Sequence, residues 1–208
     1  MIRTAAVAFA TFLATVGPVD LAALLAALTP YHTAAERRRV GFKAVCIAAV
    51  ILMLFSFGGN ALLAYLGISL AALRISGGIL LLIMAIGMVF GEGAGSRRPS
   101  GEEAVEAMQR PDISVFPMAT PLIAGPATIS ASLLLMAETR GQPLLQATVV
   151  GAMLAVLAIT LLMFMAASGV QRILGVTGLH VVSRTVGVVL SALAVQFMLD
   201  GLLQSGIF

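Results

Sequence analysis

Apolar residues run along this chain in segments that are too long for a soluble domain. No charged side chain occurs between Val45 and Leu73 or between Gly141 and Gln171. A helix needs roughly 20 apolar residues to cross a bilayer. The pattern predicts an all-α polytopic membrane protein with six transmembrane helices, at residues 4–28, 44–65, 68–90, 113–137, 145–170 and 180–204.

One polar stretch, residues 91–112, divides the chain into three-helix halves at 1–90 and 113–208 that form one integrated membrane domain. The loops on one side of the predicted bilayer carry nine of the twelve basic residues, and basic loops mark the cytoplasmic side. Those nine are Arg37, Arg38, Arg39, Lys43, Arg97, Arg98, Arg110, Arg172 and Arg184. The linker is therefore predicted to be cytoplasmic and both termini to lie outside.

The two halves contain matching motifs in the same order. "VGPVD" at residues 16–20 matches "AGPAT" 108 residues later, and "LGIS" at 66–69 matches "LGVT" at the same offset. "LRISGGILL" at 73–81 matches "SRTVGVVLS" 110 residues later. Because each half has three spans, the second half must insert with opposite polarity. Inverted repeats of this kind are typical of secondary transporters.

Each half also contains a Gly-Pro pair about 20 Å into its first span, near the bilayer midplane. Proline suits the first position of a helix, and glycine tolerates the irregular backbone before it. The pairs Gly17-Pro18 and Gly125-Pro126 therefore predict that the first and fourth spans are broken and restart within the membrane. N–H groups at a helix start bind carboxylates. The predicted substrate site comprises Thr15, Gly17, Pro18, Val19, Asp20, Thr120, Pro121, Gly125, Pro126, Ala127 and Thr128.

Three charged residues within or near the spans have more than one interpretation. Asp20 is an intramembrane carboxylate, which is a functional candidate; it could carry a coupling proton, bind a substrate ammonium or cap its helix. Arg74 and Arg184 occupy matching positions in the repeat. They are auxiliary candidates for neutralising a substrate carboxylate, and the alternative is that they extend to the membrane interfaces.

The remaining composition argues against several other classes. Apolar residues make up 60% of the chain and charged residues 10%. The basic residues flank the spans, which indicates orientation in the bilayer and no nucleic-acid partner. No Walker motif, metal-ligand spacing or catalytic cluster is present, so no enzyme activity, cofactor or metal is predicted. The single cysteine, Cys46, is predicted to be a buried structural residue.

These motifs resemble the MarC family of six-span bacterial inner-membrane proteins. The resemblance is carried by "LGISLAALRISGGILL", "FPMATPLIAGPATIS" and "SRTVGVVLSALAVQFMLDG". It implies transport of small neutral amino acids such as glycine and alanine, a relation to LysE-type exporters, and broken first and fourth spans around a central site. Thr120, Pro121, Gly125, Pro126 and Thr128 match the family motif of the second half, and Gly17 and Pro18 match that of the first. The family usually has Asn or Asp where this chain has Gly17, and Asp20 is the candidate to replace that side chain.

The sequence therefore predicts a secondary transporter of small neutral amino acids that works by alternating access between the two breaks. The alternative is an exporter of drugs or other amphiphiles, for which the eleven methionines give some support. A third hypothesis is a membrane scaffold. The sequence leaves open the exact substrate, the direction of transport, the coupling ion (proton or sodium) and the oligomeric state.

Overall fold

The computed structural model describes residues 1–29, 32–90 and 112–205, and the side chains of Ala27, Asn60, 167–180, 182 and 183 are not part of that description. The predicted linker, apart from Asp112, lies outside the described residues. Every element of the described chain is helical: α1 (Ile2–Val16), α2 (Pro18–Leu28), α3 (Ala34–Tyr65), α4 (Leu70–Phe90), η1 (Ser114–Ile123), α6 (Pro126–Glu138), α7 (Pro143–Met165) and α8 (Ala167–Gln204).

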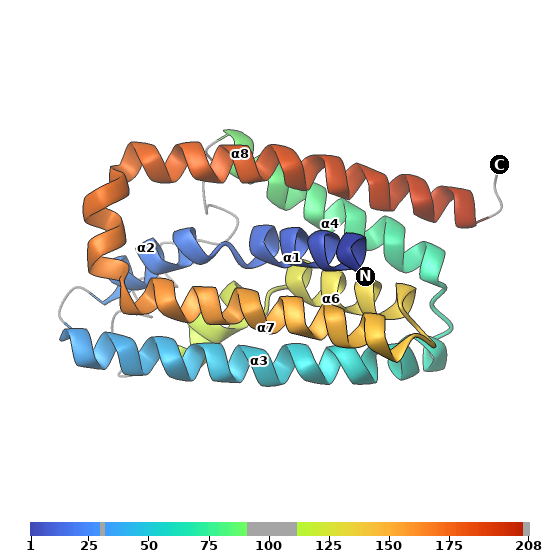
Figure 1. The fold of residues 1–208 in the computed structure, drawn as a ribbon, viewed down its shortest axis with the longest axis horizontal. Helices are drawn as coiled ribbons and strands as arrows, with labels where there is room; N and C mark the ends of the chain where they lie inside the picture. The colour runs from blue at the N-terminus through green and yellow to red at the C-terminus, as the bar shows by residue number, and fades with distance from the viewer. Residues whose placement is uncertain (30–31, 91–111, 206–208) are drawn as a thin grey trace.

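The prediction of an all-α protein with several membrane-spanning helices is confirmed. Among the described residues, five segments are long and apolar enough to cross a membrane, and the bent pair η1–α6 provides a sixth. The segment Ile2–Ala26, which contains the break between α1 and α2, counts as one of the five. Figure 1 shows that η1 and α6 run opposite to α1 and α2, α7 opposite to α3, and α8 opposite to α4. These directions support the predicted inverted repeat, and α1 begins and α8 ends at the same end of the bundle (Figure 1).

Two helices begin earlier than the hydropathy pattern predicts. Helix α3 starts at Ala34, ten residues before the predicted span, because Thr33 and Glu36 form a capping box. Arg37 then donates to the hydroxyl and the carbonyl of Thr29, both at 2.9 Å, and so caps the end of α2. Helix α8 starts at Ala167, and its first turns run across the end of the bundle before the apolar part (Figure 1).

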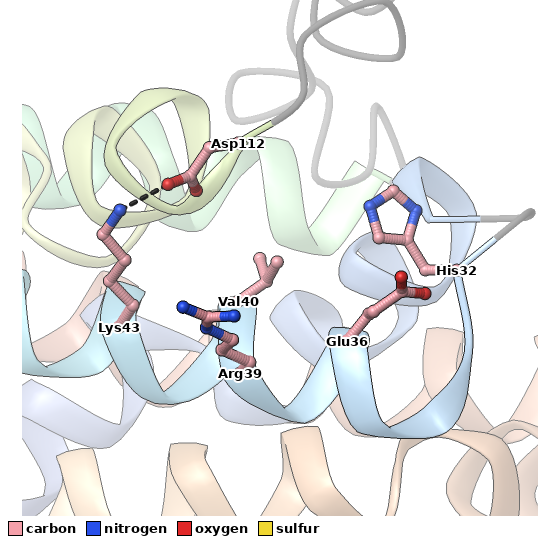
Figure 2. Close-up of a pocket in the computed structure, with 6 residues that line it drawn as sticks. All are labelled: His32, Glu36, Arg39, Val40, Lys43 and Asp112. Carbon is pink, nitrogen blue, oxygen red and sulfur yellow. Dashed lines mark hydrogen bonds and ion pairs between the residues drawn. The ribbon is translucent and has the colours of Figure 1, made fainter.

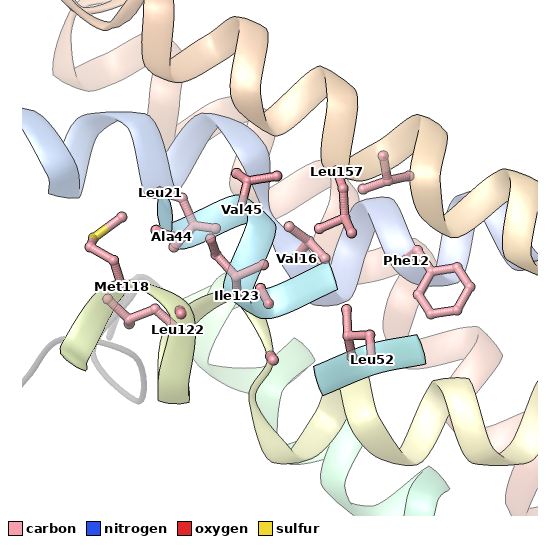
Figure 3. Packing of buried hydrophobic residues seen from close by; sticks show 14 of the residues in the cluster. Phe12, Val16, Leu21, Ala44, Val45, Leu52, Met118, Leu122, Ile123 and Leu157 are labelled. Atoms are coloured by element: carbon pink, nitrogen blue, oxygen red, sulfur yellow. The ribbon is translucent and has the colours of Figure 1, made fainter. Parts of the chain in front are cut away.

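The larger hydrophobic core joins α1, α2, α3, η1, α6 and α7. Figure 3 shows Met118, Leu122 and Ile123 of η1 directed toward side chains of α2 and α3. This packing fixes the segment that precedes the second break. The prediction for Cys46 was wrong, because its side chain is exposed on the outer face of α3. An apolar helix in a bundle has a lipid-facing side, and a small apolar residue such as cysteine fits there as well as in the core.

Small residues bring α4 and α8 into contact at the level of the backbone. A Cβ atom added to Gly78 would lie 2.8 Å from the carbonyl oxygen of Ala194. One added to Gly187 would lie 3.1 Å from the oxygen of Ala85, and one added to Gly201 would lie 3.0 Å from that of Ala71. We call these six residues the small-residue seam, and on each helix they recur every seven residues. Such residues allow close helix approach in membranes.

Candidate functional site

The first break is a single residue in the left-handed conformation. Gly17 has φ 60° and ψ 62°, and its N–H donates to the carbonyl of Leu13 at 2.9 Å, which ends α1. Glycine adopts this conformation without the cost that a Cβ atom would add. Pro18 then opens α2, whose first backbone bond runs from the N–H of Leu21 to the carbonyl of Gly17 at 3.0 Å. The N–H groups of Val19 and Asp20 thus precede the first bond of α2.

The second break is longer and begins in η1. Phe116 and Thr120 are extended because each precedes a proline, which disfavours helical backbone at the preceding residue. A wide turn spans each of these two residues. The N–H of Met118 donates to the carbonyl of Ile113 (3.2 Å), and the N–H of Ala124 donates to the carbonyl of Ala119 (2.9 Å). The hydroxyl of Thr120 donates to the carbonyl of Val115 at 3.3 Å. Local bonds of this kind satisfy backbone groups that an α-helix would otherwise pair.

Helix α6 restarts the span at a bend of 54°. Gly125 is extended, Pro126 occupies the first helical position, and the N–H of Ile129 makes the first bond, to the carbonyl of Gly125 at 2.9 Å. The N–H groups of Ala127 and Thr128 therefore come before that bond. A Cβ atom on Gly125 would lie 2.4 Å from the carbonyl oxygen of Pro121, which explains why glycine is required here.

The two breaks are in direct contact. The hydroxyl of Thr128, in the first turn of α6, donates to the backbone carbonyl of Thr15 at 3.3 Å. Thr15 lies in the last turn of α1, so its carbonyl belongs to the negative end of that helix. Both residues are at most 1% exposed. The structure thus brings a helix start from one half against a helix end from the other.

The other predicted site residues differ in their exposure. Gly17, Pro18 and Gly125 are buried with Thr15 and Thr128. Val19, Asp20, Thr120 and Ala127 are half-buried, and Pro121 and Pro126 are exposed. The predicted residues therefore form a buried contact flanked by more accessible groups.

Sequence reasoning missed three buried hydroxyl groups near these elements. Ser132, one turn after Thr128 on α6, shares a 2.6 Å hydrogen bond with Ser56 of α3. Thr11, one turn before Thr15 on α1, is fully buried, and its hydroxyl has no hydrogen-bond partner among the described residues. Residues four apart lie on the same face of a helix, so Ser132 shares a face with Thr128 and Thr11 shares a face with Thr15. This spacing could have identified both residues from the sequence.

The structure does not bring Arg74 or Arg184 to the breaks. Arg74 forms an ion pair with Glu138 at 3.0 Å and donates to the side chain of Gln204 at 2.7 Å. Glu138 lies ten residues beyond Thr128, about 15 Å along α6. Arg184 is exposed and makes no hydrogen bond or ion pair with the described residues of either break. Arg74, Glu138 and Gln204 thus join the ends of α4, α6 and α8.

Long apolar helices, one of them bent at a Gly-Pro break that contacts a second break, define a polytopic integral membrane protein built around discontinuous helices. The chain belongs to the MarC family of integral membrane proteins, which matches residues 2–205.

Curated relatives agree with this assignment over almost their whole length. The UPF0056 membrane protein YhcE of Escherichia coli K12 is 34% identical over 96% of this chain and 91% of its own. The UPF0056 membrane protein YvbG of Bacillus subtilis is 31% identical, over 93% and 92%. The UPF0056 inner membrane protein YhgN of Escherichia coli K12 is 34% identical, over 82% of each chain. No solved structure matches the chain significantly.

Proposed function

We propose that this protein is a secondary transporter of small neutral amino acids, of the glycine and alanine class. The observation that carries the proposal is the hydrogen bond between Thr128 and the carbonyl of Thr15, which joins the two breaks. Irregular backbone at membrane depth is tolerated where it is buried in protein or lines a cavity. Helix starts supply N–H donors for a carboxylate, and helix ends supply carbonyl acceptors for an ammonium or a coupling cation.

Two further observations support a polar ligand of small size. The hydroxyl of Thr11 has no partner in the described part of the chain, which is costly in an apolar interior unless a ligand or water bonds to it. Thr15, Val16 and Thr128 are nearly inaccessible, which favours a narrow site over the wide apolar cavity that a drug exporter needs. Under this proposal transport proceeds by alternating access, driven by a proton or sodium gradient. The orientation with both termini outside belongs to the same proposal, as does the bacterial inner membrane, where the relative YhgN is named as residing.

The experiment is uptake of labelled glycine and alanine into proteoliposomes, with protein-free vesicles as the control. Saturable flux is expected for the wild type. A Thr128→Val variant keeps the shape of the side chain but removes the donor, so we expect a lower flux and a loss of stability of about 1 kcal/mol. The absence of flux for any small amino acid, with protein that stays folded and monodisperse, would exclude the proposal.

An Asp20→Asn variant separates the three roles of that residue. Asp20 lies in the first turn of α2, after the N-cap Gly17, so a purely structural Asp20 would act through its charge on the helix dipole. Asparagine would then lower stability slightly and leave both transport activities unchanged. If Asp20 carries the coupling proton, gradient-driven accumulation is lost while exchange of labelled for unlabelled substrate continues. If it binds the substrate ammonium, both activities fall because the KM rises. We expect accumulation to be lost and exchange to persist, because an ionisable group within a span is typical of proton relays; accumulation at the wild-type level would contradict this role.

A further inference from the structure

A polar cavity of about 370 Å³ lies at the end of the bundle where the second broken span begins. Its walls come from His32, from the first turns of α3 and from Asp112, which lies two residues before η1. Figure 2 shows the six lining residues, His32, Glu36, Arg39, Val40, Lys43 and Asp112. Small-molecule sites have volumes from about 300 Å³ upward, so this cavity suits a small ligand.

The two carboxylates of the cavity are already engaged by groups of the protein. Glu36 accepts hydrogen bonds from the N–H and the hydroxyl of Thr33, at 2.7 and 2.9 Å. Asp112 accepts from the ammonium of Lys43 and from the N–H of Ser114 at 3.0 Å. Lys43 and Ser114 lower the pKa of Asp112 to about 2, so this carboxylate is charged at neutral pH. Both carboxylates of the cavity therefore bond to groups of the protein itself. The basic side chains of the cavity are the candidates for binding a ligand.

Arg39 is the arginine among the residues that line the cavity. Its side chain is exposed on α3, and its guanidinium makes no hydrogen bond or ion pair with the described part of the chain. Figure 2 shows the guanidinium between Lys43 and Glu36, and the His32 ring beside the Glu36 carboxylate. A guanidinium offers planar pairs of donors that match a carboxylate, which an ammonium does not.

The cavity also adjoins the start of η1, the helix that leads to the second break. Asp112 accepts from both the N–H and the hydroxyl of Ser114, the first residue of η1, so the wall of the cavity is continuous with the helix that ends at the second break. We propose that this cavity is a vestibule that binds the carboxylate of the amino-acid substrate through Arg39, before the substrate reaches the breaks. This inference rests on the proposed transport function and adds to it a second substrate-binding position.

The test compares Arg39→Gln with Arg38→Gln in sided glycine transport. Arg38 is the adjacent exposed arginine and does not line the cavity, so it is a matched control for charge. We expect Arg39→Gln to raise the KM about tenfold from the side that faces the cavity, as for the loss of one charge-assisted hydrogen bond. The maximal rate from the cavity side stays unchanged. Because a substitution cannot alter the transport equilibrium, Vmax/KM must fall equally in the opposite direction, where the maximal rate falls and the KM stays unchanged. Arg38→Gln behaves as the wild type, and Arg39→Lys recovers part of the affinity.

The outcomes separate the vestibule from the transport function itself. Flux by the wild type with the same KM for both glutamine variants overturns the vestibule alone. Absence of flux by the wild type removes the transport function, and the vestibule with it. The measurement is repeated in phosphatidylcholine vesicles with and without phosphatidylglycerol. A KM difference that occurs only with the anionic lipid means that Arg39 binds a lipid headgroup, which also overturns the proposal.

Discussion

Replacement of Gly125 by alanine is expected to reduce glycine transport by about tenfold or more, since overpacking costs about 1–3 kcal/mol. The added Cβ atom would lie 2.4 Å from the carbonyl oxygen of Pro121. That oxygen belongs to the backbone of the turn just before the break, so it cannot move away as the end of a flexible side chain could. The backbone must shift instead, and the shift would displace Pro126 and the first turn of α6. The hydrogen bond from Thr128 to Thr15 would then be lost.

The matched control for this variant is Gly151→Ala in α7. A Cβ atom at Gly151 meets nothing within 4 Å, and alanine is about 1 kcal/mol more favourable than glycine in a helix. This control should therefore transport as the wild type does, with equal or higher thermal stability. Transport by Gly125→Ala at the control level would show that the geometry of the second break is not needed for function.

Replacement of Gly78 by alanine is expected to lower stability by about 1–3 kcal/mol. The added Cβ atom would lie 2.8 Å from the carbonyl oxygen of Ala194 and 2.6 Å from the Cγ atom of Met198, so α4 and α8 would have to separate. Interfaces between membrane helices depend on such close packing. Lipid tails are as apolar as the side chains, so the hydrophobic effect does not hold the helices together. The measurement is the fraction of protein that remains monodisperse on size-exclusion chromatography after heating in detergent.

The adjacent Gly77 supplies the control. A Cβ atom there would lie 3.7 Å from the Cβ of Ser130, which is an ordinary contact. Gly77→Ala should therefore unfold at the wild-type temperature or slightly above it. Equal losses for the two variants would mean that both glycines act through helix flexibility, and that the small-residue seam does not hold α4 and α8 together.

Local sequence rules predicted the number of spans and the position of both breaks. Gly17-Pro18 and Gly125-Pro126 combine a residue that tolerates irregular backbone with one that starts a helix, and the structure ends and restarts a helix at each pair. The difference between the two breaks was not predictable in the same way. Gly17 interrupts the helix for one residue without a bend above 40°, whereas the span at Gly125 bends by 54° because Pro117 and Pro121 disrupt the turns before it.

Contacts between distant segments were harder to predict than local structure. The repeat predicted that both breaks lie near the bilayer midplane, but the contact of Thr128 with Thr15 depends on the packing angle of α1 against α6. The pairing of Arg74 with Glu138 depends on the same kind of long-range packing. Helix starts were misplaced for a different reason. Hydropathy locates the apolar part of a span, whereas the capping box at Thr33 sets where α3 begins.

The small-residue seam also limits how the length of the chain can vary. An α-helix turns by about 100° per residue, so one inserted or deleted residue rotates everything beyond it by that angle. An insertion between Ala71 and Ala85, or between Gly187 and Gly201, would replace small residues at the contact with larger ones. The connection at residues 66–69 carries no such restriction, because it lies outside the seam. Insertions and deletions among related chains should therefore accumulate in connections of that kind and be absent from these two helical segments.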